Sequence, residues 1–504
     1  MLFKLIIWTS FLVIWQQSQV VVAKQRKNVV CYHGTWSTYR QGAGKFDIES
    51  IDPFLCTHLM YAFFGIEESG DLRIIDPYLD LEDNYGRGNI RKFNALKLKN
   101  PTLKTLAAVG GWNEGSKKFS IVAADPAKRE KFVSSVVQFL QKYGFDGIDL
   151  DWEYPGQRHK LQNNDRANFL LLLRELKEGL EPFGYMLTAA VGSIKHSADI
   201  SYDIPEMMKY LDFVNVMAYD LHGPWAPVVG INAPLYAGPQ DTTEIAKQMN
   251  VDAIVKYWLS KGAVREKFIL GVPFYGRSFT LENSNNHNVG APHIGRGIAG
   301  QYSLEPGVIG YNEFCEKLQT EKSIWNLEWE ADQKVPYAYS DRNWLGYENE
   351  KSLALKAYYV VKEELGGVMV WSLESDDFRG VCGKKPYPLL NVINDVLNGG
   401  VYRPTKSPNE TPKKPELSKK PETPKQPEAN NNVTGGNGQS NMNSVANSGG
   451  VAQCQGKSGY IRDAVDCGKF YYCDNGIAHS FQCPPTLYFD LNNLNCNYSA
   501  MVEC

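Results

Sequence analysis

The chain has 504 residues, which is too long for one ordinary domain and long enough to bury a large core. Its 53 Lys and Arg nearly balance 56 Asp and Glu, for a formal charge of −3, and this balance gives no support to a nucleic-acid partner, which would select a basic face. Apolar residues make up 43% and aromatic residues 12%, so most of the chain can bury surface and is not disordered.

The first 23 residues have the composition of an export signal. Lys4 precedes an apolar run over residues 5–15, and a polar stretch then leads to Val21-Val22-Ala23. The run is shorter than the ~20 residues that span a membrane, and a buried strand or helix is the alternative interpretation. We predict a signal peptide over 1–23 and a secreted, extracellular protein without a membrane partner, because no later stretch is long and apolar enough to span a bilayer.

Eight short apolar runs, many of them separated by helical patterns, predict an α/β protein with a parallel sheet covered by helices. Eight such units fit a closed (β/α)8 TIM barrel, and an open doubly wound sheet is the alternative. The strand runs are Val29–His33, His58–Phe64, Thr105–Gly110, Gly147–Glu153, Leu187–Val191, Phe213–Tyr219, Phe268–Tyr275 and Gly367–Leu373. The clearest helical patterns are Lys128–Tyr143, Asn168–Leu180 and Thr243–Lys261. The long interval before the last run predicts an inserted α+β subdomain at about 278–350.

Composition changes sharply after the barrel. Residues 403–430 hold seven Pro, and 430–450 are rich in Asn, Gly and Ser, so neither stretch can bury enough apolar surface to fold. We predict a barrel over 24–400, a linker over 401–451 and a small module over 452–504. Three Asn-X-Ser/Thr sequons predict glycosylation at Asn409, Asn432 and Asn497.

The fourth run carries acids at two-residue steps. Alternation along a strand puts Asp149, Asp151 and Glu153 on one face and apolar side chains on the other. Carboxylates stacked in a confined space cannot all ionise cheaply, so we predict shared protons, a raised pKa and a Glu that acts as a general acid. A solvated edge strand and a calcium site are the alternatives, but the apolar face demands burial and the Gly and carbonyl turns of a calcium loop are missing. We expect no metal.

The acidic run resembles the D-x-x-D-x-D-x-E signature of chitinases in glycoside hydrolase family 18, here Asp146, Asp149, Asp151 and Glu153. Three more segments are similar to motifs that follow strands in that family. They are Gly110-Gly111-Trp112-Asn113, Met217-Ala218-Tyr219-Asp220 and Gly367-Val368-Met369-Val370-Trp371-Ser372. The resemblance covers roughly residues 28–395.

The resemblance implies a substrate-assisted hydrolysis that retains anomeric configuration. Glu153 would protonate the glycosidic oxygen, and Asp151 would turn between Asp149 and the sugar's N-acetyl group, whose carbonyl attacks the anomeric carbon. Tyr219 would bind the acetamido group from the other side. Aromatic and polar residues would line the cleft, because flat rings bury the C–H faces of sugars. The expected substrate-binding residues are Tyr32, Trp36, Phe63, Gly110, Gly111, Trp112, Asn113, Tyr154, Met217, Asp220, Trp225, Tyr275, Arg277 and Trp371.

The family pattern also implies cis peptide bonds at Ala62–Phe63, Glu153–Tyr154 and Trp371–Ser372. It pairs Cys31 with Cys56 and Cys315 with Cys382. No cofactor is expected.

The last 51 residues hold six Cys, which allow 15 connectivities. The segments Cys467–Cys473, Cys483-Pro484-Pro485 and Leu487–Asp490 resemble peritrophin-A-type chitin-binding modules. That family's pattern gives Cys454–Cys473, Cys467–Cys504 and Cys483–Cys496. The family's usual Cys-Asp-Trp-Pro is here Cys496-Asn497-Tyr498-Ser499, and a glycan on Asn497 would cover the sugar-binding face. A stability cap or a partner-binding domain is the alternative.

Together these patterns predict a secreted, monomeric endochitinase that acts on chitin and chito-oligosaccharides. Two alternatives remain at this point. A non-catalytic chitin-binding lectin on the same barrel would typically lack the terminal acid, which is present here as Glu153. An endoglycosidase acting on N-linked glycans would have no use for a chitin-binding module.

Overall fold

The computed structural model describes residues 27–158, 164–383, 385–400 and 402, and in the C-terminal region 459–463, 465–474, 477–483, 487–491 and 495–498. The predicted signal peptide, nearly all of the predicted linker, both linker sequons (Asn409 and Asn432), Cys454 and Cys504 lie outside these residues. In the part of the chain that the structure describes, no helix is both long enough and apolar enough to cross a membrane.

Eight parallel strands form a closed barrel, which confirms the TIM-barrel prediction and excludes the open sheet. The strands are β1 (Asn28–Gly34), β2 (His58–Ile66), β4 (Lys104–Gly110), β5 (Gly147–Asp151), β6 (Met186–Gly192), β7 (Phe213–Met217), β8 (Phe268–Pro273) and β15 (Gly367–Trp371). Strand β1 closes the barrel because it pairs with both β2 and β15: Cys31 lies opposite Leu59 on one side and Val370 on the other. A short β3 (Leu72–Arg73) adds an antiparallel edge to β2.

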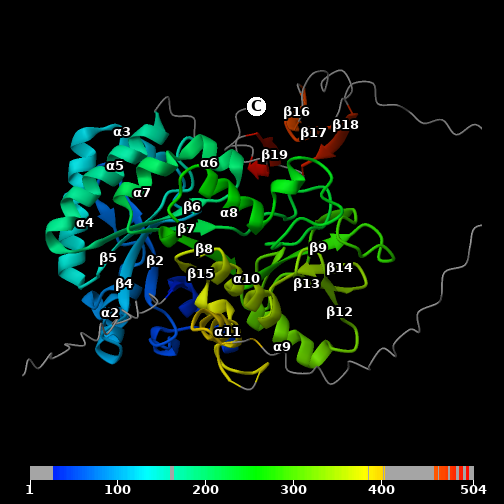
Figure 1. Ribbon diagram of the computed structural model, residues 1–504, viewed down its shortest axis with the longest axis horizontal. Helices are drawn as coiled ribbons and strands as arrows, with labels where there is room; N and C mark the ends of the chain where they lie inside the picture. Colours follow the sequence, from blue (N-terminus) through cyan, green and yellow to red (C-terminus); the bar gives the residue numbers. More distant parts are fainter. Residues whose placement is uncertain are drawn as a thin grey trace, which may run out of the picture.

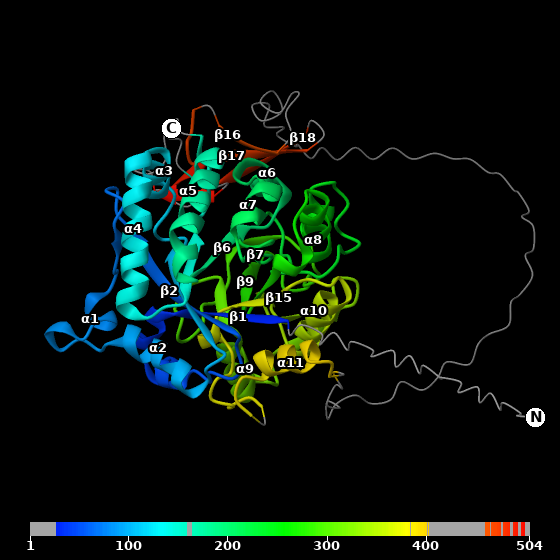
Figure 2. The same cartoon turned by 60° about the vertical axis from the view of Figure 1, so that its left-hand side comes forward.

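Helices cover the outside of the strands, and α4, α5 and α7 lie next to one another there (Figures 1 and 2). The helices are α1 (Pro77–Asp80), α2 (Asn89–Lys99), α3 (Lys117–Ala124), α4 (Pro126–Tyr143), α5 (Asp165–Leu180), α6 (Lys195–Ser201), α7 (Ile204–Tyr210), α8 (Val251–Ser260), α9 (Tyr311–Glu321), α10 (Glu350–Lys362) and α11 (Pro388–Leu397). One large apolar cluster fills the layer between strands and helices, and a smaller one, which includes Val30, Met60 and Met369, fills the barrel interior.

Several predicted boundaries are wrong by a few residues. The helix expected over 243–261 begins only at Val251, because the Asn250 side chain accepts the Ala253 N–H at 2.9 Å and caps the helix there. Strand β5 ends at Asp151 and not at Glu153, since Gly110 opposite Asp151 is the last residue of β4 that pairs with it. Strand β7 likewise ends at Met217, before Tyr219.

The chain between β8 and β15 forms the inserted subdomain, which confirms that part of the predicted fold class. Its antiparallel sheet has the order β10-β9-β14-β13-β12, with β11 also paired to β9, and it lies beside the barrel with α9 (Figure 1). The strands are β9 (Tyr275–Leu281), β10 (His293–Arg296), β11 (Val308–Gly310), β12 (Asn326–Glu330), β13 (Val335–Ser340) and β14 (Asn343–Gly346). The run predicted as one strand over 268–275 is therefore divided between β8 and the start of β9.

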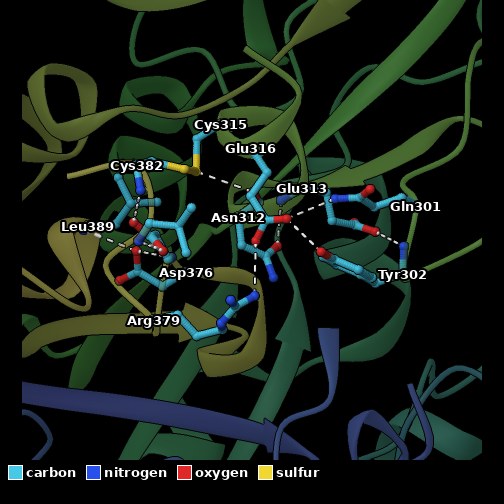
Figure 3. Close-up of a disulfide and its surroundings, with 12 residues drawn as sticks. Gln301, Tyr302, Asn312, Glu313, Cys315, Glu316, Asp376, Arg379, Cys382 and Leu389 are labelled. Carbon is cyan, nitrogen blue, oxygen red and sulfur yellow. Dashed lines mark hydrogen bonds and ion pairs between the residues drawn. A yellow bond between two sulfur atoms is a disulfide. The ribbon is translucent and has the colours of Figure 1, made fainter. Parts of the chain in front are cut away.

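Two disulfides lie in the described residues of the barrel and the inserted subdomain. Cys31 in β1 is joined to Cys56, and Cys315 in α9 is joined to Cys382 in the loop after β15, as the family pattern implies. Beside the second disulfide, Arg379 lies 3.5 Å from Glu316, which adds an ion pair between the same two segments (Figure 3).

Within the described residues, one group of side chains has the spacing to hold a metal ion. It consists of Cys315, Asp377 and Cys382, but its two sulfur atoms are joined in the disulfide.

The C-terminal module contains two small antiparallel sheets. Strands β16 (Gly459–Arg462), β17 (Lys469–Asp474) and β18 (Ile477–Gln482) form one, and β19 (Leu487–Asp490) and β20 (Asn495–Tyr498) form the other. The rings of Phe470 and Phe489 stack between them, with centroids 3.7 Å apart. Cys467, Cys473 and Cys483 are disulfide-bonded. Each of the three predicted pairings includes one of Cys454, Cys496 and Cys504, whose side chains the structure does not describe, so the pairings stay predictions.

Candidate active site

Strand β5 has one face toward the helices and one toward the barrel interior. Ile148, Leu150 and Trp152 belong to the apolar layer under the helices, and the indole N–H of Trp152 donates to Ser116 Oγ at 2.6 Å. Asp149 and Asp151 face inward, with 0% and 2% of their surface exposed. The predicted alternation therefore holds within the strand.

Asp149 accepts hydrogen bonds from residues on three other strands, β1, β6 and β7. The hydroxyls of Tyr32 and Thr188 both donate to it, and the Asn215 amide donates at 3.2 Å. Burial nevertheless raises the pKa of this carboxyl, against the lowering effect of the hydrogen bonds. Sequence reasoning missed Thr188 and Asn215, although each is a polar residue inside an apolar strand run.

Asp151 hydrogen-bonds to Asp149, and its Oδ2 atom, although buried, has no hydrogen-bond partner in the part of the chain that the structure describes. Burial, the charge of Asp149 and the charge of Glu153, in that order, raise the pKa of Asp151 well above its usual range. The raised pKa values favour one proton shared by the pair, and the Oδ2 atom of Asp151 remains available to a group that enters the site.

Glu153 lies two residues beyond the end of β5, where its side chain is partly buried. Burial raises its pKa to about 7, and the charge of Asp220 adds to this, whereas Arg158 and a hydrogen bond with Tyr154 lower it. The raised pKa was expected from the stacked acids of the same strand, but burial is the largest cause, and the like charge that adds to it is that of Asp220. A carboxyl with this pKa is half protonated near neutral pH and can donate a proton.

Arg158 joins the acid to an aromatic residue, and no sequence pattern indicated it. Its guanidinium lies 3.8 Å from the centre of the Trp112 ring. One of its nitrogens donates to the carbonyl of Trp112 at 2.7 Å and to that of Glu153 at 3.2 Å. Trp112 is 52% exposed and therefore offers a flat surface to a ligand.

A polar cluster lies at the end of β7. Asp220 accepts from Tyr275 Oη at 2.7 Å and from Arg277 Nε at 2.8 Å, and the Arg277 guanidinium also faces Trp225 at 5.1 Å. Tyr219 packs edge-on against Tyr275, with centroids 6.2 Å apart. These predicted residues come together, because β9 of the inserted subdomain supplies Tyr275 and Arg277.

Aromatic rings from β1, the 3-10 helix Thr35–Tyr39 that follows it, β2 and β15 form a continuous surface, which we call the aromatic floor (Tyr32, Trp36, Phe63 and Trp371). Trp371 stacks on Phe63 at 5.7 Å, and Trp36 stacks on Phe63 at 6.2 Å. Trp36 is 45% exposed, whereas Tyr32 is buried and reaches Asp149. The floor therefore extends from the buried acids toward solvent. Cis peptide bonds occur at Ala62–Phe63, Glu153–Tyr154 and Trp371–Ser372, the three positions that the family pattern implies.

Gly110 and Gly111 have positive φ angles of 122° and 84°, and both lie in close contact with the site. A Cβ on Gly110 would meet the Asp151 carbonyl at 2.3 Å, and one on Gly111 would meet the Phe63 ring at 2.6 Å. These two glycines therefore allow the backbone after β4 to pack closely against Asp151 and Phe63. Asn113 is exposed, and Met217 is partly buried beside the barrel interior.

Asp146 is part of the sequence signature but lies away from the acids. It binds Lys97 at 2.8 Å and accepts the Thr105 N–H at 2.9 Å, at the beginning of β5. These bonds lower its pKa against the effect of partial burial. Its role is to fix the start of the strand.

Comparison with known proteins agrees with this geometry. Residues 28–376 match the model of the glycosyl hydrolases family 18, and residues 454–504 match that of the chitin binding Peritrophin-A domain. An endochitinase of Manduca sexta is 38% identical over 78% of this chain and 71% of its own. Chitotriosidase-1 of Mus musculus is 37% identical over 94% and 95%.

A solved structure of similar fold is the Group IV chitinase of Ostrinia furnacalis in complex with allosamidin, which is 47% identical with a TM-score of 0.72 and covers 74% of this chain and all of its own. The family match spans the whole barrel, from β1 through β15, and includes each acid and ring placed above. The chain therefore belongs to the glycosyl hydrolases family 18 and carries a C-terminal chitin binding Peritrophin-A domain.

Proposed function

We propose that this protein is a secreted, monomeric endochitinase that hydrolyses β-1,4-linked N-acetylglucosamine polymers by a retaining, substrate-assisted mechanism. Family membership supports glycoside hydrolysis, and the relatives described above are chitinases. The observation that carries the mechanism is the buried pair Asp149–Asp151, in which the Oδ2 atom of Asp151 has no hydrogen-bond partner among the described residues and is close enough to feel the charge of Glu153.

In the proposed reaction Glu153 donates its proton to the glycosidic oxygen as the bond to the anomeric carbon breaks. The acetamido carbonyl oxygen of the same sugar attacks that carbon, and an oxazolinium ion forms. Asp151 hydrogen-bonds the acetamido N–H and stabilises the positive charge, and Tyr219 binds the acetamido oxygen. Glu153, now ionised, takes a proton from a water molecule, whose oxygen attacks the anomeric carbon. This attack opens the oxazolinium ring, and the anomeric configuration of the sugar is retained. No cofactor is required.

The aromatic floor and Trp112 bind the sugar chain. Apolar sugar faces stack on exposed rings at small entropic cost, and the near-neutral charge of the chain suits an uncharged polymer. Tyr154, Asp220, Trp225, Tyr275 and Arg277 supply the remaining contacts on the other side of the site.

We also propose that residues 1–23 are removed on secretion and that residues 401–451 tether the module at 452–504 to the barrel. The tether raises the local concentration of substrate, because the module stays bound to solid chitin. N-terminal sequencing of the secreted protein would begin near Lys24, and size-exclusion chromatography would give the mass of one chain.

The decisive experiment compares wild type with Glu153→Gln on hexa-N-acetylchitohexaose. The wild type should release shorter oligomers whose new reducing ends are first the β-anomer by NMR, and the variant should release almost none. Fully deacetylated oligomers of the same length should resist the wild type, because they lack the acetamido group. Equal hydrolysis by both proteins would show that Glu153 is not the acid, and binding without hydrolysis by the wild type would favour a lectin.

A further inference from the structure

Glu374 is a fully buried acid for which the proposed mechanism has no use. It lies in the 3-10 turn Leu373–Ser375, which Ser372 separates from Trp371, and only 1% of its surface is exposed. We propose that Glu374 is a positioning residue that holds Trp36 and Trp371 in register and thereby sets the affinity of the aromatic floor for sugar. The identity of the sugar rests on the proposed function.

The carboxylate of Glu374 connects the ends of two barrel strands. One oxygen accepts the Gly34 N–H, at the end of β1, at 3.1 Å, and the other accepts the Ser372 hydroxyl at 2.6 Å. Ser372 is bonded to Trp371, and Gly34 precedes the 3-10 helix Thr35–Tyr39 that carries Trp36. Both floor residues are therefore at most two residues from a hydrogen bond to the same carboxylate.

The backbone carbonyl of Glu374 binds the far end of that 3-10 helix. It accepts from the Arg40 guanidinium at 3.3 Å, and Arg40 directly follows the helix. The same carbonyl accepts the Asn312 amide of α9 at 3.2 Å. One residue thus fixes both ends of the element that carries Trp36 and links it to the inserted subdomain.

The packing at this point leaves little freedom. A Cβ on Gly34 would lie 2.5 Å from a Glu374 oxygen and 2.8 Å from the Trp36 ring, so only glycine admits both side chains there. The Trp36 and Trp371 rings are 6.1 Å apart, within contact range of a single sugar chain. A shift of the carboxylate therefore displaces both rings.

Among the described residues, no ionised side chain pairs directly with the carboxyl of Glu374. The nearest basic ring, His33, is 4.0 Å away, and burial lowers the pKa of His33 to about 3, so that it is neutral at ordinary pH. Arg40 is the cation that faces the carboxyl, but its hydrogen bond goes to the carbonyl. A buried acid without an ion pair is costly, which is consistent with a geometric role as an acceptor of two hydrogen bonds.

The test measures sugar binding in a Glu153→Gln parent, which removes turnover. Calorimetry with tetra-N-acetylchitotetraose should show a Kd about 10-fold higher for Glu374→Ala. Glu374→Gln should recover to within about 2-fold, because its amide oxygen accepts from Gly34 and its amide N–H donates to Ser372. Near-UV circular dichroism should lose the coupled signal of the Trp36–Trp371 pair in the Ala variant and keep it in the Gln variant.

Asp376 is the matched control. It is equally buried and two residues away, but its carboxylate accepts the N–H of Leu389 at 3.3 Å (Figure 3). It also accepts the N–H of Leu390, likewise in α11, at 2.9 Å. Asp376→Ala should lower the melting temperature and leave the Kd unchanged. If Glu374→Ala fails to fold, Ser372→Ala removes one of the two bonds and should give an intermediate Kd.

Two results would overturn the proposal: an unchanged Kd and dichroism in Glu374→Ala, or an equal rise of Kd in the Asp376 control. Failure of the Glu153→Gln parent to bind the tetramer would count against the proposed function instead. The dichroism of the sugar-free proteins would still decide whether Glu374 positions the two rings.

Discussion

The carboxyls of Asp149 and Asp151 hydrogen-bond to each other inside the barrel; Thr188 and Asn215 donate to Asp149, whereas the buried Oδ2 atom of Asp151 has no hydrogen-bond partner among the described residues. This asymmetry separates two roles on one strand face. Asp149 is held by hydroxyl and amide donors, whereas Asp151 keeps one oxygen for a ligand.

Asp151→Asn should reduce kcat on chito-oligosaccharides by about 100-fold or more, because a neutral amide cannot balance the charge of the oxazolinium ion. The melting temperature should change little, since the new amide N–H still donates to Asp149. Steady-state kinetics and calorimetric melting would check both. A kcat near that of the wild type would contradict the assignment of Asp151.

The pH profile should report Glu153. As the proposed proton donor it must be protonated to act, so activity should be present below its pKa of about 7 and fall as the pH rises through that value. Arg158 lowers that pKa, and therefore Arg158→Gln should move the basic limb of kcat/KM to higher pH. Arg158→Lys, which keeps the charge, should leave the limb in place.

Asp220→Asn should have the opposite effect. The charge of Asp220 raises the pKa of Glu153, so its removal should move the basic limb to lower pH. The KM should also rise, because Tyr275 and Arg277 lose the carboxylate that orients them. Limbs that shift in the same direction for Arg158→Gln and Asp220→Asn would contradict the electrostatic account.

Replacing Cys31 and Cys56 by Ser should destabilise the barrel by ~3.5 kcal/mol in the chain-entropy account, because the disulfide closes a loop of 25 residues. Denaturant unfolding of the double variant measures this loss. Activity at low temperature should persist, as neither residue touches the acids. A stability equal to that of the wild type would mean that the closed loop adds nothing.

Truncation after residue 402 should leave kcat/KM on soluble oligomers within about 2-fold of the full chain and slow the hydrolysis of solid chitin several-fold. A pull-down with chitin powder would measure retention directly. Equal retention of both proteins would show that the barrel alone binds the solid.

The barrel was predictable because parallel strands are buried on both faces and read as apolar runs. The ends of the strands were not predictable, because they depend on pairing with the adjacent strand: β5 ends at Asp151, opposite Gly110, the last residue of β4 that pairs with it. The acids were predictable from their spacing of two residues. Arg158 was not, because a single Arg in a polar segment gives no pattern, and its role depends on the backbone that places it over Trp112.

The family signature combined residues with different roles. Asp146 is held by Lys97 and the Thr105 N–H at the end of β5 that is farther from the site. The spacing of the acids in the sequence could not distinguish Asp146 from the acids that face inward. Glu374 gave no signal either, since an isolated Glu in a loop is usually exposed.

The loop after β4 is attached to the catalytic strand, since the Gly111 N–H donates to the Asp151 carbonyl at 2.8 Å. Arg158 forms a second attachment, from the carbonyl of Glu153 to that of Trp112. Glu153 and Trp112 are therefore held on a common frame. Motion of the loop after β4 would carry Glu153 and Trp112 together, so a ligand stacked on that ring would keep its place relative to the carboxyl.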